Sequence, residues 1–144
     1  MAKQRKEKKQ RKERKVSTPR SRAQLSKKFA IEAAKLAIDN HCTNVVVLEL
    51  KGMSSVTDYF VIATGTSNRQ MRTVADEING ISGKFDFSLF GRAGYEQARW
   101  ILLDFVDVVV HIFDKEYREF YDLELLWGDA KRLIIEKKLA TETE

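Results

Sequence analysis

The stretch that decides the fold is residues 100–127, which read W-I-L-L-D-F-V-D-V-V-V-H-I-F-D-K-E-Y-R-E-F-Y-D-L-E-L-L-W. Its first half consists of most of two apolar segments, residues 99–105 and 107–113, which are separated by a single residue. Such segments predict two strands joined as a tight antiparallel hairpin about Phe105 and Val106. A β-branched side chain such as that of Val106 resists positive φ, so the type of turn stays open.

The second half, residues 114–127, predicts an aromatic and acidic helix that ends near Gly128. Its large apolar side chains are too many for the single stripe that a helix turns toward a core. They are Tyr117, Phe120, Tyr121, Leu123, Leu125, Leu126 and Trp127. We therefore expect some of them to face outwards or to be covered by another chain. A homodimer is one such arrangement, and the sequence leaves the oligomeric state open.

Residue spacing predicts the other elements of the fold. Two segments have apolar residues at helical spacing, and others are short and rich in strand-forming residues. The predicted helices cover 23–40 and 68–81, and the predicted strands cover 44–50, 57–64 and, less regularly, 85–90. Residues 91–94 read as a glycine-containing loop. The fold class that follows is α/β, with a mixed sheet of about five strands flanked by helices.

Ser67 and Gln70 stand three residues apart at the start of the second predicted helix. This is the spacing of a capping box, in which a hydroxyl and an amide satisfy amide donors left free at a helix start. A strand followed by glycine and hydroxyl residues at a helix N-terminus also suits a phosphate. Capping is the favoured interpretation, because the glycine repeats and the lysine of a P-loop are missing.

The net charge of +5 conceals two parts of opposite sign. Residues 1–22 carry 11 Lys and Arg against two Glu, a net of +9, which leaves 15 basic and 19 acidic residues, a net of −4, in residues 23–144. We expect a disordered basic tail at 1–22, one domain at 23–130 and a charged extension at 131–144. The domain suits a basic protein surface, whereas only the tail suits nucleic acid.

The basic tail has two interpretations. It is either a plain solvated segment or an arm that contacts ribosomal or other RNA through counterion release. The residues expected to make such contacts are Lys8, Lys9, Arg11, Lys12, Arg14 and Lys15. An RNA-binding arm would make a contribution to binding that depends steeply on salt.

Cysteine content and hydropathy exclude several classes of protein. The single cysteine, Cys42, excludes an internal disulfide and a zinc site built from several thiols, and we expect it to be structural. No run approaches the roughly 20 apolar residues of a membrane-spanning helix. The start is rich in Lys and Gln with interspersed Glu, unlike a secretory or transit peptide. We expect a cytoplasmic protein with no contact to a membrane.

Asp104 and Asp107 are the nearest candidates for a metal-dependent nucleotidyltransferase. They lack the alternate spacing that places two carboxylates on one face of a strand, and turn carboxylates commonly accept backbone amides. His111 has no nucleophile beside it in sequence, so a structural role is favoured. The sequence therefore predicts no catalytic residue, no metal and no cofactor.

Trp100 begins a strand in which alternate residues share a face. Trp100, Leu102 and Asp104 are expected on one side, and Ile101 and Leu103 on the other. An aromatic residue beside apolar groups and an acid is typical of a protein-interface hot spot. A core tryptophan explains the same pattern equally well, and periodicity alone does not decide between the two.

Three blocks of the sequence carry a family resemblance. They are T-D-Y-F-V-I-A-T-G-T-S-N-R-Q at 57–70, W-I-L-L-D-F-V-D-V-V-V-H-I-F at 100–113 and F-Y-D-L-E-L-L-W at 120–127. In this order they resemble the ribosomal silencing factor family, also called the Iojap family. The resemblance spans about residues 25–128.

The resemblance implies a non-catalytic α/β domain similar in shape to nucleotidyltransferases. Members of the family bind large-subunit ribosomal protein number fourteen and block joining of the small subunit, which lowers translation when nutrients are scarce. Matched position by position, the implied docking surface consists of Trp100, Ile101, Leu102, Asp104, Tyr121, Leu123 and Glu124. A metal-dependent nucleotidyltransferase and an RNA-binding adaptor that acts through the tail remain the alternatives.

Two positions depart from the family pattern. Val106 stands where the family usually has glycine before the second aspartate, which leaves the conformation of the hairpin turn undecided. Arg92 and Ala93 stand where an apolar residue and glutamate commonly lie between two glycines. The second departure removes an acid from a loop near the implied docking surface.

Overall fold

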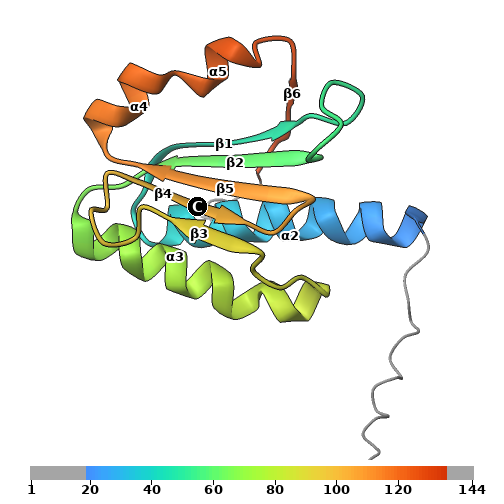
Figure 1. Ribbon diagram of the computed structural model, residues 1–144, viewed down its shortest axis with the longest axis horizontal. Helices are drawn as coiled ribbons and strands as arrows, with labels where there is room; N and C mark the ends of the chain where they lie inside the picture. Colours follow the sequence, from blue (N-terminus) through green and yellow to red (C-terminus); the bar gives the residue numbers. More distant parts are fainter. Residues whose placement is uncertain (1–18, 136–144) are drawn as a thin grey trace, which may run out of the picture.

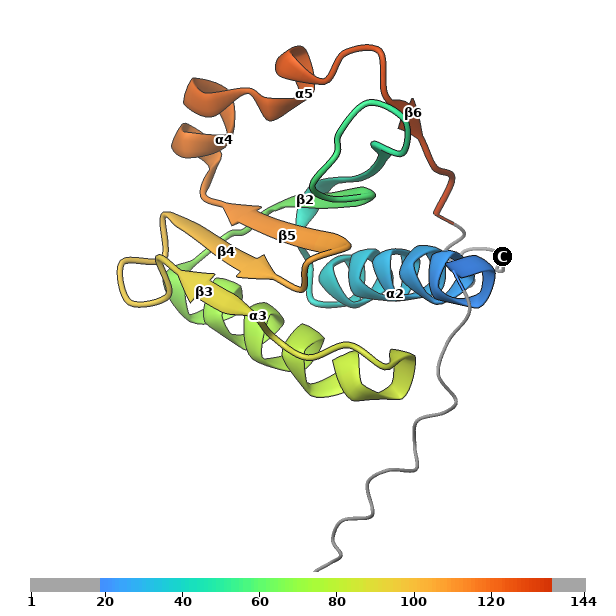
Figure 2. The same ribbon diagram turned by 45° about the vertical axis from the view of Figure 1, so that its right-hand side comes forward.

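A computed structural model describes residues 19–135 of the chain and shows one mixed sheet between two layers of helices (Figure 1). The long helices α2 (Pro19–Asp39) and α3 (Asn68–Ser82) cover one face of the sheet. The short helices α4 (Lys115–Tyr121) and α5 (Leu123–Leu126) lie over the other face. Figure 2 shows the same layers from a second direction.

The sheet has six strands in the order β3-β4-β5-β2-β1-β6. Their bounds are β1 Thr43–Glu49, β2 Tyr59–Thr64, β3 Gly91–Ala93, β4 Trp100–Asp104, β5 Val108–Phe113 and β6 Lys131–Arg132. Only β2 and β5 pair in parallel, and the other four neighbouring pairs are antiparallel. The predicted α/β class with a mixed sheet is confirmed, with one strand more than expected.

The main core lies between the sheet and the two long helices. Helix α2 presents a row of buried alanines to the sheet, and their small side chains leave room for the backbone to approach closely. These residues are Ala30, Ala33, Ala34 and Ala37. Phe29 fills the wider space beside them, with its ring 4.9 Å from that of Phe105 and 5.2 Å from that of Phe87. Helix α3 buries the four residues that its spacing predicts, Met71, Val74, Ala75 and Ile78.

A second, smaller core lies on the side of α4 and α5. Its buried members are Leu48, Leu50, Ile62, Phe113 and Ala130, and its partly buried members are Val46, Phe60, Trp100, Tyr117, Leu123 and Trp127. These side chains come from the sheet, both short helices and the segment that follows them. The C-terminal part of the fold is therefore held to the sheet by apolar contacts rather than by long helices.

Helix α2 begins at Pro19, four residues earlier than the predicted start of the domain at residue 23. Arg22, which the charge count assigns to the tail, is part of the folded domain. Its Nε atom donates to Asp107 Oδ2 at 3.0 Å, and its guanidinium lies 4.3 Å from the ring centre of Phe87. The folded structure therefore extends into the last four residues of the segment predicted as a tail.

Two predictions about the middle of the chain are wrong. Residues 85–90 form no strand, because Gly83–Phe85 is a turn of 3₁₀ helix that ends at Asp86 with a φ of 65°. The segment predicted as a glycine loop instead forms the edge strand β3, whose pairing with β4 joins Gly91 to Asp104. A three-residue strand has no periodicity to detect.

Two predictions about the C-terminal part also need correction. The helix expected over residues 114–127 is broken at Asp122, which has a φ of 27° and accepts a hydrogen bond from the Leu125 amide. Aspartate tolerates this backbone conformation and its side chain caps the next helix. The break between α4 and α5 therefore follows from the residue at this position. The predicted charged extension starts with β6, which pairs with β1 at the edge of the sheet.

The predicted hairpin between β4 and β5 is confirmed, and its turn is strained. Val106 has a φ of 75°, and the Asp107 amide donates to the Phe105 carbonyl at 3.0 Å. A bond between residues two apart, with positive φ between them, is the pattern of the rarer and strained γ-turn. The Asp104 carboxylate accepts from the Val106 amide at 2.8 Å and helps to hold this conformation.

Replacement of Val106 by glycine is expected to stabilise the protein. Glycine removes a backbone strain of about 1 to 2 kcal/mol, and about half of this gain is offset by the greater entropy of the unfolded chain. We expect the free energy of unfolding of Val106→Gly to rise by about 0.5 to 1 kcal/mol in urea titrations. Val106→Ala, which keeps a Cβ atom at positive φ, should gain less, and an equal or larger gain for alanine would contradict the strain argument.

Candidate functional site

Strand β4 presents its alternate residues to the two layers as the sequence predicts. Trp100, Leu102 and Asp104 are partly exposed on the side of α4 and α5, whereas Ile101 and Leu103 are buried against the long helices. The Ile101 side chain has no exposed surface. Its expected part in direct docking is therefore wrong, because it points into the main core.

Trp100 combines the two roles that periodicity leaves open. Its ring lies 4.8 Å from that of Phe113 on the sheet and 4.8 Å from that of Tyr121 on helix α4. Its indole Nε1 donates to His111 Nδ1 at 3.1 Å. The side chain belongs to the second core and remains partly exposed. Trp100 is thus an anchored aromatic residue at the border between the core and the surface.

The short helices carry exposed apolar side chains, two of which, Phe120 and Tyr121, form a series of ring contacts with Trp100. We use the name apolar ridge for Phe120, Tyr121, Leu125 and Leu126. Phe120, Leu125 and Leu126 are between 73% and 78% exposed, and the Tyr121 ring joins Phe120, at 4.9 Å, to Trp100. Large exposed apolar groups gathered within one short segment, here residues 120–126, typically mark an interaction surface. The sequence predicts outward-facing groups in this segment, but which ones follows only from the break at Asp122.

Glu124 holds the short helices to the sheet. Its carboxylate accepts from Arg118 Nε at 3.0 Å and lies 3.4 Å from Arg132 Nη1 on β6. Arg118 is 9% exposed and also donates to Thr64 Oγ1 on β2 at 2.8 Å. The structure therefore gives Glu124, which the resemblance places on the docking surface, an internal role. Leu123 is likewise half-buried in the second core.

Asp104 and Asp107 are held by different partners. The Asp104 carboxylate accepts from the Val106 amide, and the Asp107 carboxylate accepts from Arg22 Nε. Among residues 19–135, no group of three or more His, Cys, Asp and Glu side chains is arranged to hold a metal ion. The geometry agrees with the interpretation that these two aspartates serve the turn and the strand end.

His111 is buried in the sheet, with 4% of its surface exposed. Burial lowers the pKa of its imidazole to about 3. The ring is therefore neutral near pH 7, and its Nδ1 atom is free to accept from Trp100. This arrangement agrees with a structural role for the histidine. The contact with Trp100 is a feature that sequence spacing does not show.

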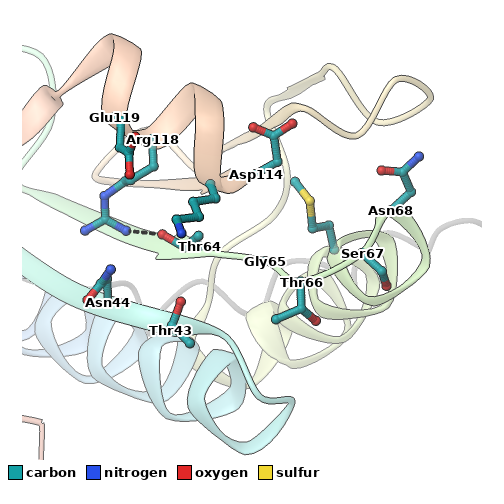
Figure 3. A pocket seen from close by; sticks show the side chains of 12 residues that line it. Thr43, Asn44, Thr64, Gly65, Thr66, Ser67, Asn68, Asp114, Arg118 and Glu119 are labelled. Carbon is teal, nitrogen blue, oxygen red and sulfur yellow. Dashed lines mark hydrogen bonds between the residues drawn. The ribbon is translucent and has the colours of Figure 1, made fainter.

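A cleft of about 600 Å³ lies where β2 leads into α3 and where α4 begins (Figure 3). Some of the polar groups around it bond within the protein. Ser67 Oγ accepts from the Gln70 amide at 3.1 Å, and Gln70 Oε1 accepts from the Thr66 amide at 2.7 Å. The predicted capping interaction is confirmed. The Thr66 and Gln70 amides therefore already have acceptors within the protein, which agrees with the preference for capping over phosphate binding.

The tail residues expected to contact RNA lie outside the described part of the chain. No helix within residues 19–135 is long and apolar enough to cross a membrane. Cys42 is free and buried, and burial raises its thiol pKa to about 11, which agrees with the expected structural role.

Removal of the Glu124 carboxylate is expected to destabilise the protein without any partner present. In Glu124→Ala, the buried guanidinium of Arg118 loses its charge partner and keeps only the hydroxyl of Thr64. We expect a loss of about 2 kcal/mol in the free energy of unfolding, reduced from the full value for a buried pair because Glu124 is partly exposed. Urea denaturation of purified protein measures it. Glu119→Ala, on the exposed side of α4, is the control and should change stability little; equal losses would contradict the internal role.

Comparison with known proteins identifies the family. The family model described as "Ribosomal silencing factor during starvation" matches residues 23–144. The ribosomal silencing factor of Halalkalibacterium halodurans is 42% identical over 98 residues, which are 68% of this chain and 84% of that protein. The ribosomal silencing factor of Bacillus subtilis is 40% identical over 98 residues, which are 68% of this chain and 83% of that protein.

A solved structure agrees with these sequence matches. The crystal structure of a protein from Chromobacterium violaceum aligns with a TM-score of 0.65 at 33% sequence identity. The alignment covers 73% of this chain and 85% of that one. The sequence matches and the fold thus agree over most of the chain, and the chain belongs to the ribosomal silencing factor family.

Proposed function

We propose that this protein binds the large ribosomal subunit through ribosomal protein number fourteen and blocks joining of the small subunit. The observation that carries the proposal is the anchored Trp100 beside the exposed apolar ridge, in a chain whose relatives are named ribosomal silencing factors. The action is steric, so no bond is made or broken. It lowers translation in the cytoplasm when nutrients are limiting.

The proposed docking surface combines residues from β4 and the short helices. The direct contacts are Trp100, Leu102, Asp104, Phe120, Tyr121, Leu125 and Leu126. Leu123 and Glu124 support this surface from beneath, and Ile101 supports it from the main core. An aromatic anchor with apolar neighbours and an acidic group at the edge is suited to a partner that is basic around an apolar centre.

Charge supports the choice of partner. Residues 23–144 carry a net charge of −4, so the domain as a whole is attracted to a basic protein surface rather than to bare phosphates. We assign contact with ribosomal RNA to the basic tail, which carries a net charge of +9 over residues 1–22. The domain selects the partner, and the tail adds affinity that salt weakens.

A second copy of the chain is the competing occupant of the apolar ridge. Exposed groups of this size are covered in a homodimer as readily as in a complex with another protein. We propose that any homodimer formed through the ridge competes with docking, since both would use Phe120 and Leu125.

Truncation of the anchor should weaken binding to the large subunit. Removal of an aromatic side chain from the centre of an interface costs about 2 to 4 kcal/mol, or roughly 30- to 1,000-fold in affinity. We expect this loss for Trp100→Ala in co-sedimentation with purified large subunits. Phe120→Ala tests the same surface without touching the core, because Phe120 is 78% exposed.

The matched control for this experiment is Val56→Ala. Val56 is 77% exposed in the loop between β1 and β2 and lies outside the proposed surface. It should bind as the parent protein does. Parent-like co-sedimentation of both Trp100→Ala and Phe120→Ala would remove the docking assignment.

Deletion of residues 2–18 tests the role assigned to the tail. These residues include nine Lys and Arg. We expect the shortened protein to bind large subunits more weakly and with a shallower dependence on salt concentration, because fewer counterions are released. Binding should persist at low salt. Complete loss of binding would instead favour an RNA-binding adaptor that acts through the tail.

A further inference from the structure

His111 is a polar residue in an apolar setting. It lies on β5 between Val110 and Ile112, both fully buried, and its own ring is 4% exposed. Its side chain makes one hydrogen bond within the described residues, the bond between its Nδ1 atom and Trp100 Nε1. The other ring nitrogen, Nε2, is buried and has no partner among residues 19–135.

The direction of this hydrogen bond follows from the chemistry of the two rings. An indole Nε1–H is a donor only, so His111 Nδ1 must be the acceptor. The imidazole is neutral in this buried position, and its one proton is therefore on Nε2. The donor without a partner is thus Nε2–H, while the acceptor is fully used by Trp100.

An unpartnered buried donor weakens a fold, so its presence needs a reason. An apolar residue at position 111 would fill the same space without removing a polar group from water. What histidine provides, and leucine or phenylalanine does not, is an acceptor for the Trp100 indole. Positions where a sequence departs from good packing are commonly positions of function.

The hydrogen bond from Trp100 to His111 lies at one end of a series of contacting aromatic rings. The Trp100 ring lies 4.8 Å from the rings of both Phe113 and Tyr121, and the Tyr121 ring lies 4.9 Å from that of the exposed Phe120. The interplanar angle between Trp100 and Tyr121 is 44°. The orientation of the indole therefore sets how Tyr121 and the start of the apolar ridge lie on the sheet.

We propose that His111 is a positioning residue, which fixes the Trp100 indole in one orientation and thereby preorganises the surface that docks on the large subunit. This inference rests on the proposed function. A ring already held in its bound orientation loses less entropy on binding. His111 itself does not reach the partner, because it is buried beneath Trp100 and Phe60.

Two substitutions of nearly equal shape separate the hydrogen bond from packing. The side-chain oxygen of His111→Asn is two bonds from Cβ, as is Nδ1 of histidine, and can accept from the indole. His111→Leu has the same branched shape and no acceptor. The readout is the indole Nε1–H signal in ¹H–¹⁵N NMR of the full chain. The protein has two tryptophans, so Trp127→Phe assigns the signal of Trp100.

The expected results differ between the two variants. In His111→Leu, exchange of the Trp100 indole proton with water should accelerate by roughly tenfold, and affinity for purified large subunits should fall about three- to tenfold, as expected for one hydrogen bond. His111→Asn should stay within about twofold of the parent protein in both measurements. The Trp127 signal should be the same in all three proteins.

Several results would overturn the inference. Equal exchange rates in parent, His111→Leu and His111→Asn would show that the hydrogen bond does not hold the indole. In the unmodified protein, ¹⁵N NMR of the imidazole must find the proton on Nε2; a proton on Nδ1 near pH 7 would refute the assigned direction without any variant. Slower indole exchange in the parent than in His111→Leu, with equal affinities, would leave the hydrogen bond intact and refute its role in docking.

The failure of the proposed function gives a different result. If Trp100→Ala and Phe120→Ala both bind large subunits as the parent does, the docking surface is wrong, and the role proposed for His111 in binding is refuted with it. If Trp100→Ala loses binding while His111→Leu keeps it, docking stands and only the positioning role is refuted. Binding by these variants therefore separates the two failures.

Discussion

The parallel pairing of β2 with β5 is the interaction on which the rest of the structure depends. It joins residues far apart in the chain, from Tyr59 beside Val108 to Thr64 beside Phe113. Because the pairing is parallel, both strands end at the same edge of the sheet, where α3 and α4 begin. At the opposite end, the β4–β5 hairpin turn contacts the residues before β2, since the Asp107 carbonyl accepts from the amides of Asp58 and Tyr59. The register of the β2–β5 pair thus sets the positions of the hairpin, of the starts of α3 and α4, and of Trp100.

The two faces of this sheet are covered unequally, and the proposed docking surface lies on the less covered face. On one face, two long helices bury the main core, and the exposed fractions of Ile101 and Leu103 are 0% and 1%. On the other face, α4 and α5 have seven and four residues. Helices this short cover the sheet incompletely, so Trp100 and Leu102 remain partly exposed. The apolar ridge is the outer side of the same thin layer.

Most of the elements were predictable because their signals are local. Helix α3 was expected from its spacing and its cap at Ser67, and the hairpin from two adjacent apolar segments. Strands β3 and β6 were not, because two or three residues carry no period and take strand form only through pairing with β4 and β1. The site was predicted in part. Alternation along β4 placed Trp100 and Leu102 correctly, whereas the internal partners of Glu124 and the bond to His111 arise from tertiary contacts.

The exposed surface therefore has no stability of its own. Isolated helices of fewer than about 12 residues are unstable in water, so α4 and α5 depend on contacts with the sheet. Arg118 joins Thr64 to Glu124, Glu124 reaches Arg132, and Tyr121 rests on Trp100. Each of these contacts ends on a strand whose position the β2–β5 register sets. A surface arranged in this way is sensitive to changes beneath it, and the role proposed for the buried His111 in docking is one consequence of this dependence.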